Sequence, residues 1–176
     1  MLFIIAKFKP YIIPVLFLML LDQFIKVIIS SAFMPYNFDI ISGFIRFNPK
    51  INTNLSWAGN HIDIFSSLIV AVVLNVFALF IFLSGYLLYR AKRNQTSFSV
   101  RIIMVCGLAG CLCSLIDKLL WGGSLDFLQI PKVFVFDLKD CYLTVSEILF
   151  VIIGVFHSKE ISVKEYVLFC CNKFRL

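Results

Sequence analysis

Four aspartates lie between Ser114 and Asp140 in a chain that has only ten acidic residues. Two carboxylates held close together in a medium of low dielectric do not both ionise easily, so they tend to share one proton. One can then accept a proton from water while the other donates to a carbonyl oxygen, which is chemistry suited to peptide hydrolysis. Asp126 and Asp140 are the candidate pair, although two acids in a surface loop are more often simply solvated.

Other catalytic and metal-binding patterns are missing from the sequence. It has no GxSxG motif, no HExxH motif and no pair of CxxC motifs, and its two histidines lie far apart. We therefore expect neither a metal nor another cofactor. The six cysteines are expected to be packing residues rather than ligands or disulfides; they are Cys106, Cys111, Cys113, Cys141, Cys170 and Cys171.

The composition is typical of a membrane protein. The chain is 61% hydrophobic, whereas a soluble domain is about half apolar, and its mean hydropathy is +0.96. The net charge of +6 comes from basic clusters that flank hydrophobic runs, a pattern that indicates cytoplasmic ends of spans rather than nucleic-acid binding.

Four segments are apolar enough to cross a bilayer, which takes roughly 20 residues of helix. They cover about 11–33, 64–89, 100–120 and 141–156, and the last is short enough that its helix could begin earlier. We predict one all-α membrane domain over residues 1–176, with four transmembrane helices and both termini in the cytoplasm. Residues 158–176 are expected to form a cytoplasmic tail with a short amphipathic helix on the inner leaflet.

The first span is expected to be retained rather than cleaved as a signal peptide. It is too long for a signal peptide and contains Asp22, Gln23 and Lys26, which a signal peptide would not tolerate.

Two segments then lie outside the cytoplasm and are expected to form a small β-rich region. In residues 34–63, alternation around Phe44, Arg46 and Asn48 predicts a strand or hairpin on the membrane surface. Residues 133–136, with the sequence VFVF, predict a buried strand. Trp57 and Trp121 are expected at the outer interface, where indoles are favoured.

Several charged residues fall within or beside the spans. Asp22 and Lys26 are four residues apart and share a helix face, which predicts a structural ion pair or the edge of a site. Asp117 and Lys118 could be a solvated helix end or could orient the loop that carries Asp126. Glu147 lies within the fourth apolar run and has no firm interpretation.

Five stretches match, in order, the motifs of one known family: DQFIK matches DQxxK, INTN an Asn-Thr-Gly segment, GCLCSLIDK matches GGALGNxxDR, SLDF matches VVDF, and FDLKD matches FNxAD. By these motifs the chain resembles the lipoprotein signal peptidase (signal peptidase II) family, whose members are four-helix intramembrane aspartic proteases. The resemblance implies that Asp126 and Asp140 are catalytic, that Asn52 lines the site, and that Asp117 supports it. It also implies cleavage of prolipoproteins on the amino side of a lipid-modified cysteine, at the extracytoplasmic face of a bacterial inner membrane, by a monomer in contact with lipid.

The chain departs from the family pattern at several positions. Lys118 stands where the family has Arg, Ser114 replaces an Asn, and Asp137 replaces the Asn of FNxAD. Asn54 and residues 55–57 replace Gly-Ala-Ala-Phe. We expect Asp137 to raise the pKa of neighbouring carboxylates.

Two alternatives remain open from the sequence. The departures could describe a membrane protein of the same fold that binds lipopeptides with little or no catalysis. A small transporter could instead use Asp22, Lys26 and Glu147 as a proton or ion relay.

Overall fold

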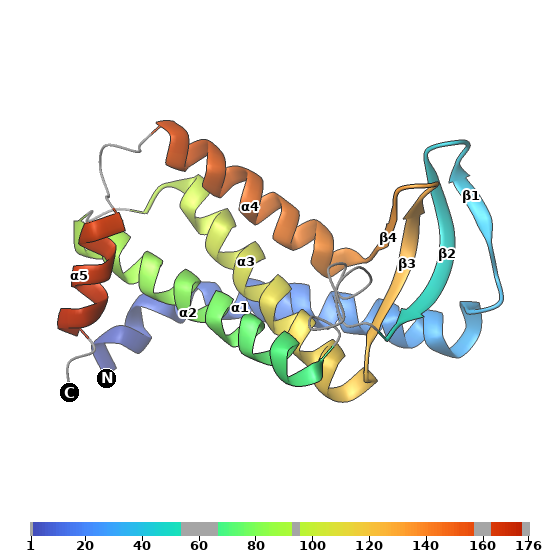
Figure 1. The fold of residues 1–176 in the computed structure, drawn as a ribbon, viewed down its shortest axis with the longest axis horizontal. Helices are drawn as coiled ribbons and strands as arrows, with labels where there is room; N and C mark the ends of the chain where they lie inside the picture. The colour runs from blue at the N-terminus through green and yellow to red at the C-terminus, as the bar shows by residue number, and fades with distance from the viewer. Residues whose placement is uncertain (1, 54–66, 93–95, 157–162, 174–176) are drawn as a thin grey trace.

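The computed structural model describes residues 2–53, 67–92, 96–156 and 163–173. Asn54, Trp57, His61 and His157 lie outside these ranges. The helices are α1 (Leu2–Ile28), α2 (Leu68–Lys92), α3 (Phe98–Ile116), α4 (Leu138–Phe156) and α5 (Val163–Lys173). The four long helices run side by side, with the β-sheet at one end and α5 and both chain termini at the other (Figure 1).

Within the part of the chain that the structure describes, three helical segments are long and apolar enough to cross a membrane. They are Phe8–Phe33, Leu68–Lys92 and Phe98–Trp121, the first and third of which end in the π-helical turns Ile29–Phe33 and Asp117–Trp121. The predicted fourth span falls in α4, which also carries Lys139, Asp140 and Glu147 and does not meet the same test. The helix begins at Leu138, earlier than the apolar run from Cys141, so Asp140 lies in its first turn.

Small residues allow α3 to pack closely against its neighbours. A Cβ added at Gly107 would lie 2.5 Å from the ring of Phe82, and one at Gly110 would lie 2.6 Å from Leu143. Close approach through small residues is typical of helix packing in membranes. Cys111 and Cys113 are buried in this packing, as expected for packing residues, whereas Cys106, Cys141 and Cys170 are half-buried and Cys171 is exposed.

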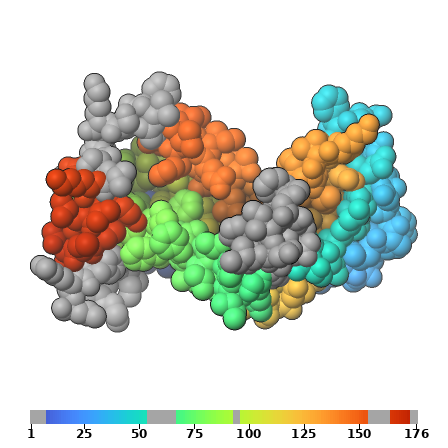
Figure 2. Space-filling view, in the orientation of Figure 1, coloured from blue at the N-terminus to red at the C-terminus, as the bar shows by residue number. Residues whose placement is uncertain are grey.

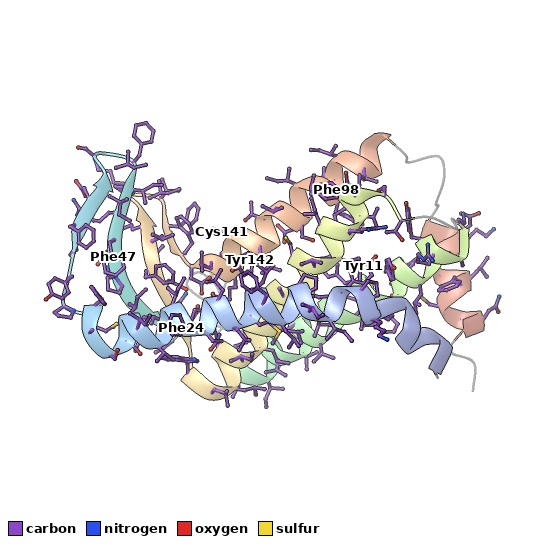
Figure 3. The ribbon with its side chains drawn as sticks, turned by 180° about the vertical axis from the view of Figure 1, so that it is seen from behind. Tyr11, Phe24, Phe47, Phe98, Cys141 and Tyr142 are labelled. Carbon is purple, nitrogen blue, oxygen red and sulfur yellow. The ribbon has the colours of Figure 1, made fainter. Side chains whose placement is uncertain are left out.

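Large apolar side chains cover the outer faces of the helices. On α1, Ile13, Phe17, Leu20 and Phe24 are each at least 63% exposed, and the side chains in Figure 3 project outward along the bundle. Such a surface suits a lipid environment, where exposed apolar side chains contact lipid tails rather than water.

The sheet is antiparallel, in the order β1-β2-β3-β4. Strands β1 (Phe38–Ile41) and β2 (Ile45–Asn52) confirm the hairpin predicted within residues 34–63. Strands β3 (Ser124–Ile130) and β4 (Phe134–Phe136) complete it. The strand predicted at 133–136 is confirmed as β4, but its predicted burial is wrong, because β4 is an edge strand in which Phe134 remains 41% exposed.

Helix α5 confirms the predicted helix in the C-terminal tail. It lies against α2, where Lys92 forms an ion pair with Glu165 at 2.7 Å and the hydroxyls of Ser84 and Tyr166 are 2.6 Å apart. Its predicted position on the inner leaflet stays a prediction.

Candidate active site

A cluster of charged side chains lies where the helices meet the sheet. It draws on α1, the π-helical turn after α3, β3 and the start of α4, although these elements are distant in sequence. Its members are Asp22, Lys26, Asp117, Lys118, Asp126, Asp137, Lys139 and Asp140. All except Asp140 are buried.

Lys26 forms ion pairs with three carboxylates of this cluster. Its Nζ lies 2.9 Å from Asp22 Oδ2, 2.6 Å from Asp117 Oδ2 and 2.7 Å from Asp137 Oδ2. None of these side chains is more than 1% exposed. The predicted pair of Asp22 and Lys26 is thus confirmed and extended, and the interpretation of Asp117 as a solvated helix end is wrong. Buried charges persist because they are paired, and here one ammonium group serves three carboxylates.

Gln23 adds neutral hydrogen bonds to the same region. Its Nε2 donates to Asp22 Oδ2 at 3.0 Å and to Asp117 Oδ1 at 3.1 Å, while its Oε1 accepts from Trp121 Nε1 at 3.0 Å. Gln23 was not predicted as a site residue, although it lies within the DQFIK stretch.

Two glycines allow β3 to begin beside the end of β2. Gly122 has a φ of +66°, a left-handed conformation that glycine adopts without strain. At Gly123 a Cβ would lie 2.7 Å from the backbone oxygen of Asn52, so only glycine permits this approach. Asn52 pairs with Ser124 and Lys50 pairs with Asp126, which fixes Asp126 on the sheet.

Hydrogen bonds then orient the Asp126 carboxylate. Ser124 Oγ donates to Asp126 Oδ1 at 2.6 Å, and Asn52 Nδ2 donates to Asp126 Oδ2 at a longer 3.4 Å. Asn52 was predicted at the site, whereas Ser124 was not. A polar residue two positions before Asp126 on a strand shares its face, and that was the available signal.

Asp140 is held by a reciprocal cap at the start of α4. Asp137 precedes the helix, and its Oδ1 accepts from the backbone N–H of Asp140 at 3.1 Å. The backbone N–H of Asp137 in turn donates to Asp140 Oδ2 at 3.2 Å. This is the capping-box arrangement, in which side chains three residues apart each satisfy the other's free N–H group.

The structure brings the carboxylates of Asp126, Asp137 and Asp140 together. One oxygen from each lies within 4.8 Å of the other two. Asp126 is 8% exposed, whereas Asp140 is 40% exposed. The space-filling view shows a hollow between α4 and the sheet (Figure 2). The group therefore combines a buried carboxylate with one that water can reach.

The surroundings shift the protonation of these three groups. Burial raises the pKa of Asp126 and of Asp140, and the nearby Asp137 carboxylate raises both further. The pKa of Asp137 itself is lowered: burial alone would raise it, but the ammonium groups of Lys139 and Lys26 outweigh that effect. The expected influence of Asp137 on its neighbours is therefore present, with burial as the larger cause.

Lys139 is the main residue that sequence reasoning missed. Its Nζ lies 2.5 Å from Asp137 Oδ2, 3.7 Å from Asp126 Oδ1 and 3.8 Å from Asp140 Oδ1. This ammonium group supplies positive charge to all three carboxylates, and we assign no metal to them. The signal was visible in FDLKD, where a lysine stands between the two acids.

Ser114 and Lys118 bond to each other rather than to the loop that carries Asp126. Lys118 Nζ donates to the backbone oxygen of Ser114 at 3.3 Å and to its hydroxyl. That loop instead lies beside Asp117, whose Oδ2 is 3.4 Å from Ser124 Oγ. Lys118 is buried, so its interpretation as a solvated helix end is wrong too.

Glu147 lies apart from the cluster. It is an exposed residue of α4, about two helical turns beyond Asp140. The structure thus gives no contact that joins Glu147 to Asp22 and Lys26 among the residues it describes.

Known proteins resemble this chain in sequence and in fold. The family model for signal peptidase (SPase) II matches residues 14–156. A bacterial membrane enzyme solved at 2.3 Å by the in meso method superposes with a TM-score of 0.70 and 20% identity, covering 88% of this chain and 93% of that one. A second, solved at 1.9 Å by the same method, has a TM-score of 0.61 and 22% identity, covering 82% and 91%. No curated protein matches the sequence.

Proposed function

We propose that this chain, which belongs to the signal peptidase II family, is an aspartic endopeptidase in which Asp126 and Asp140 form the catalytic dyad. The observation that carries the proposal is the convergence of these two carboxylates, one buried and one reached by water. Raised pKa values suit a pair that holds one proton between them near neutral pH.

The chemistry needs only the dyad and a water molecule. The ionised carboxylate takes a proton from water as its oxygen attacks the scissile carbonyl, and the protonated carboxyl donates to the carbonyl oxygen. Collapse of the tetrahedral intermediate breaks the C–N bond, and a proton passes to the departing amine. The dyad returns to its single-proton state, so no covalent intermediate or cofactor takes part.

The proposed substrates are prolipoproteins that carry a lipid-modified cysteine, cleaved on the amino side of that cysteine. The lipid chains would remain beside the apolar helices while the peptide crosses the end of the bundle. There β2 offers Asn52, whose amide already donates to Asp126. The hairpin of β1 and β2 would lie over the substrate at the membrane surface.

The proposed topology places the dyad at the extracytoplasmic face of a bacterial inner membrane. The sheet and the dyad lie at the end of the bundle opposite both chain termini (Figure 1). Basic residues near the termini would remain in the cytoplasm. In this topology α4 is the fourth span, and its charged first turn lies at the outer surface.

The experiment is cleavage of a diacylglyceryl-modified prolipoprotein by the purified protein in lipid, with the cut located by mass spectrometry. Asp126→Asn and Asp140→Asn should each abolish release of the signal peptide. Glu165→Gln is the control, because Glu165 lies on α5, at the end of the bundle opposite the sheet, and pairs with Lys92 there. Cleavage that survives in either dyad variant would contradict the proposal.

A further inference from the structure

Lys139 lies beside both carboxylates of the proposed dyad. Its Nζ is 3.7 Å from Asp126 Oδ1 and 3.8 Å from Asp140 Oδ1, and its side chain is 6% exposed. At such distances, and with little water between the groups, a positive charge strongly favours the ionised form of a carboxylate.

The ammonium group is fixed by stronger contacts on its other side. Asp137 Oδ2 and Ser124 Oγ each lie 2.5 Å from Lys139 Nζ, and Asp117 Oδ2 lies 3.3 Å away. Ser124 also donates to Asp126, so a single hydroxyl joins the lysine to the buried member of the dyad. Lys139 therefore has little freedom to swing away from the carboxylates.

Charged groups from every neighbouring element face this lysine. Carboxylates predominate over ammonium groups, so the cluster needs each of its cations. The groups are Lys26 of α1, Asp117 and Lys118 of the turn after α3, Asp126 of β3, and Asp137 and Asp140 at the start of α4, with Asp22 one contact further away beside Lys26.

We propose that Lys139 is a positioning residue that sets the pH range in which the dyad is active, and that Asp137 holds it there. The proposal rests on the proposed function, since it concerns the same dyad. Without Lys139, both carboxylates would keep their protons to higher pH, and the enzyme would lack a general base near neutrality. With it, one carboxylate ionises while the other retains the proton.

The protonation of the neighbours supports this role. Burial raises the pKa of both Asp126 and Asp140, and Lys139 is the foremost influence that opposes it at each. The pKa of Lys139 is itself raised: burial would lower it, but Asp137 and Asp140 outweigh that effect. The lysine therefore stays charged throughout the range in which the dyad titrates.

Substitutions of Asp137 and of Lys139 should move the pH profile of kcat/KM in opposite directions. One Asp137 oxygen caps α4 and the other holds the ammonium group, so Asp137→Asn keeps a cap acceptor while removing the negative charge. Lys139→Met should move the profile of kcat/KM to higher pH, by about one unit or more. Asp137→Asn should move it to lower pH, and the double variant should lie between the two single variants.

The test is kcat/KM against pH for cleavage of a lipidated prolipoprotein by these variants. Lys132→Met is the matched control, because Lys132 is exposed in the turn between β3 and β4 and its loss should leave the profile unmoved. If Lys139→Met shows no cooperative thermal unfolding transition, and so is not folded, Lys139→Gln is used in its place. A lower rate with an unmoved profile would overturn the proposal, because loss of packing alone would give that result.

A second readout separates this proposal from the proposed function. Infrared spectroscopy follows the carbonyl band of protonated carboxyl groups, and Asp126→Asn and Asp140→Asn identify the part that the dyad contributes. If no variant cleaves at any pH, the proposed function fails. Lys139→Met should still raise the pH at which half of this band's intensity is lost. An unchanged midpoint would overturn the role of Lys139 whether or not the protein cleaves.

Discussion

Asp137 and Asp140 exchange hydrogen bonds across the first turn of α4. Each side chain accepts from the other's backbone N–H, at 3.1 and 3.2 Å. The second oxygen of Asp137 lies 2.7 Å from Lys26 and 2.5 Å from Lys139. One residue thus links the helix that carries Asp140 to α1 and to the charge beside the dyad.

The cap predicts a difference between two substitutions of Asp137. Asparagine keeps an acceptor for the N–H of Asp140, whereas alanine does not. Asp137→Ala should therefore be less stable than Asp137→Asn by about 1 kcal/mol. Thermal unfolding of the two variants in the same detergent measures this difference, and equal midpoints would show that the cap adds no stability.

Removing the charge of Lys26 should greatly lower the free energy of unfolding. Lys26→Met would leave buried Asp22 without its cation and would remove one of the two ammonium groups beside Asp117 and Asp137. Breaking a buried ion pair costs about 3–5 kcal/mol, so this variant should unfold at a much lower temperature.

Lys92→Met is the control for this change. Lys92 forms a partly exposed pair with Glu165, and such pairs contribute about 0–1 kcal/mol. A drop in the unfolding temperature as large for Lys92→Met as for Lys26→Met would contradict this account of the cluster.

Adding a single methyl group at Gly123, in Gly123→Ala, should lower activity. The Cβ of Gly123→Ala would meet the backbone oxygen of Asn52 at 2.7 Å, so β2 and β3 must separate. Overpacking of this kind costs about 1–3 kcal/mol and here displaces Asn52 from Asp126. We expect a lower kcat/KM for cleavage.

Gly85→Ala is the matched control, because nothing lies within 4 Å of a Cβ at this position in α2. It should leave cleavage unchanged and leave stability unchanged or slightly higher, since alanine favours helix. Equal activity of the Gly123→Ala and Gly85→Ala variants would show that the approach of β2 to β3 is not needed.

The dyad predicts a bell-shaped dependence of kcat/KM on pH. Burial raises the pKa of both Asp126 and Asp140, so both limbs should lie above the range of an ordinary aspartate. As pH falls through the lower value the general base is protonated, and as pH rises through the upper value the proton donor is lost. A rate that stays constant across both ranges would contradict a shared-proton dyad.

The sequence predicted the hydrophobic helices and the hairpin because each leaves a local pattern, whereas the pairing of Asp126 with Asp140 was expected from the order of the family motifs. Asp22 and Lys26 share a helix face by their spacing alone. The convergence of Lys26 with Asp117 and Asp137 depends on how three distant segments pack, which spacing along the chain does not report. The exposure of Phe134 follows from the order of strands in the sheet, which the apolar run could not indicate.

Lys139 was missed for a related reason. In a loop between two acids, a lysine is usually a solvated charge. Only the fold shows that Ser124 and Asp137 hold its ammonium group inside the site. The start of α4 before its apolar run could have been predicted more firmly, because Asp137 and Asp140 have the spacing of a capping box.

The most direct test is the single-turnover rate of cleavage of a lipidated prolipoprotein, measured beside its binding affinity. We predict that Asp126→Asn and Asp140→Asn each lower the rate by at least about 100-fold while the substrate still binds. Cleavage at an unchanged rate in either variant would contradict the dyad. Binding without cleavage by the unsubstituted protein would instead indicate a lipopeptide-binding protein of this fold.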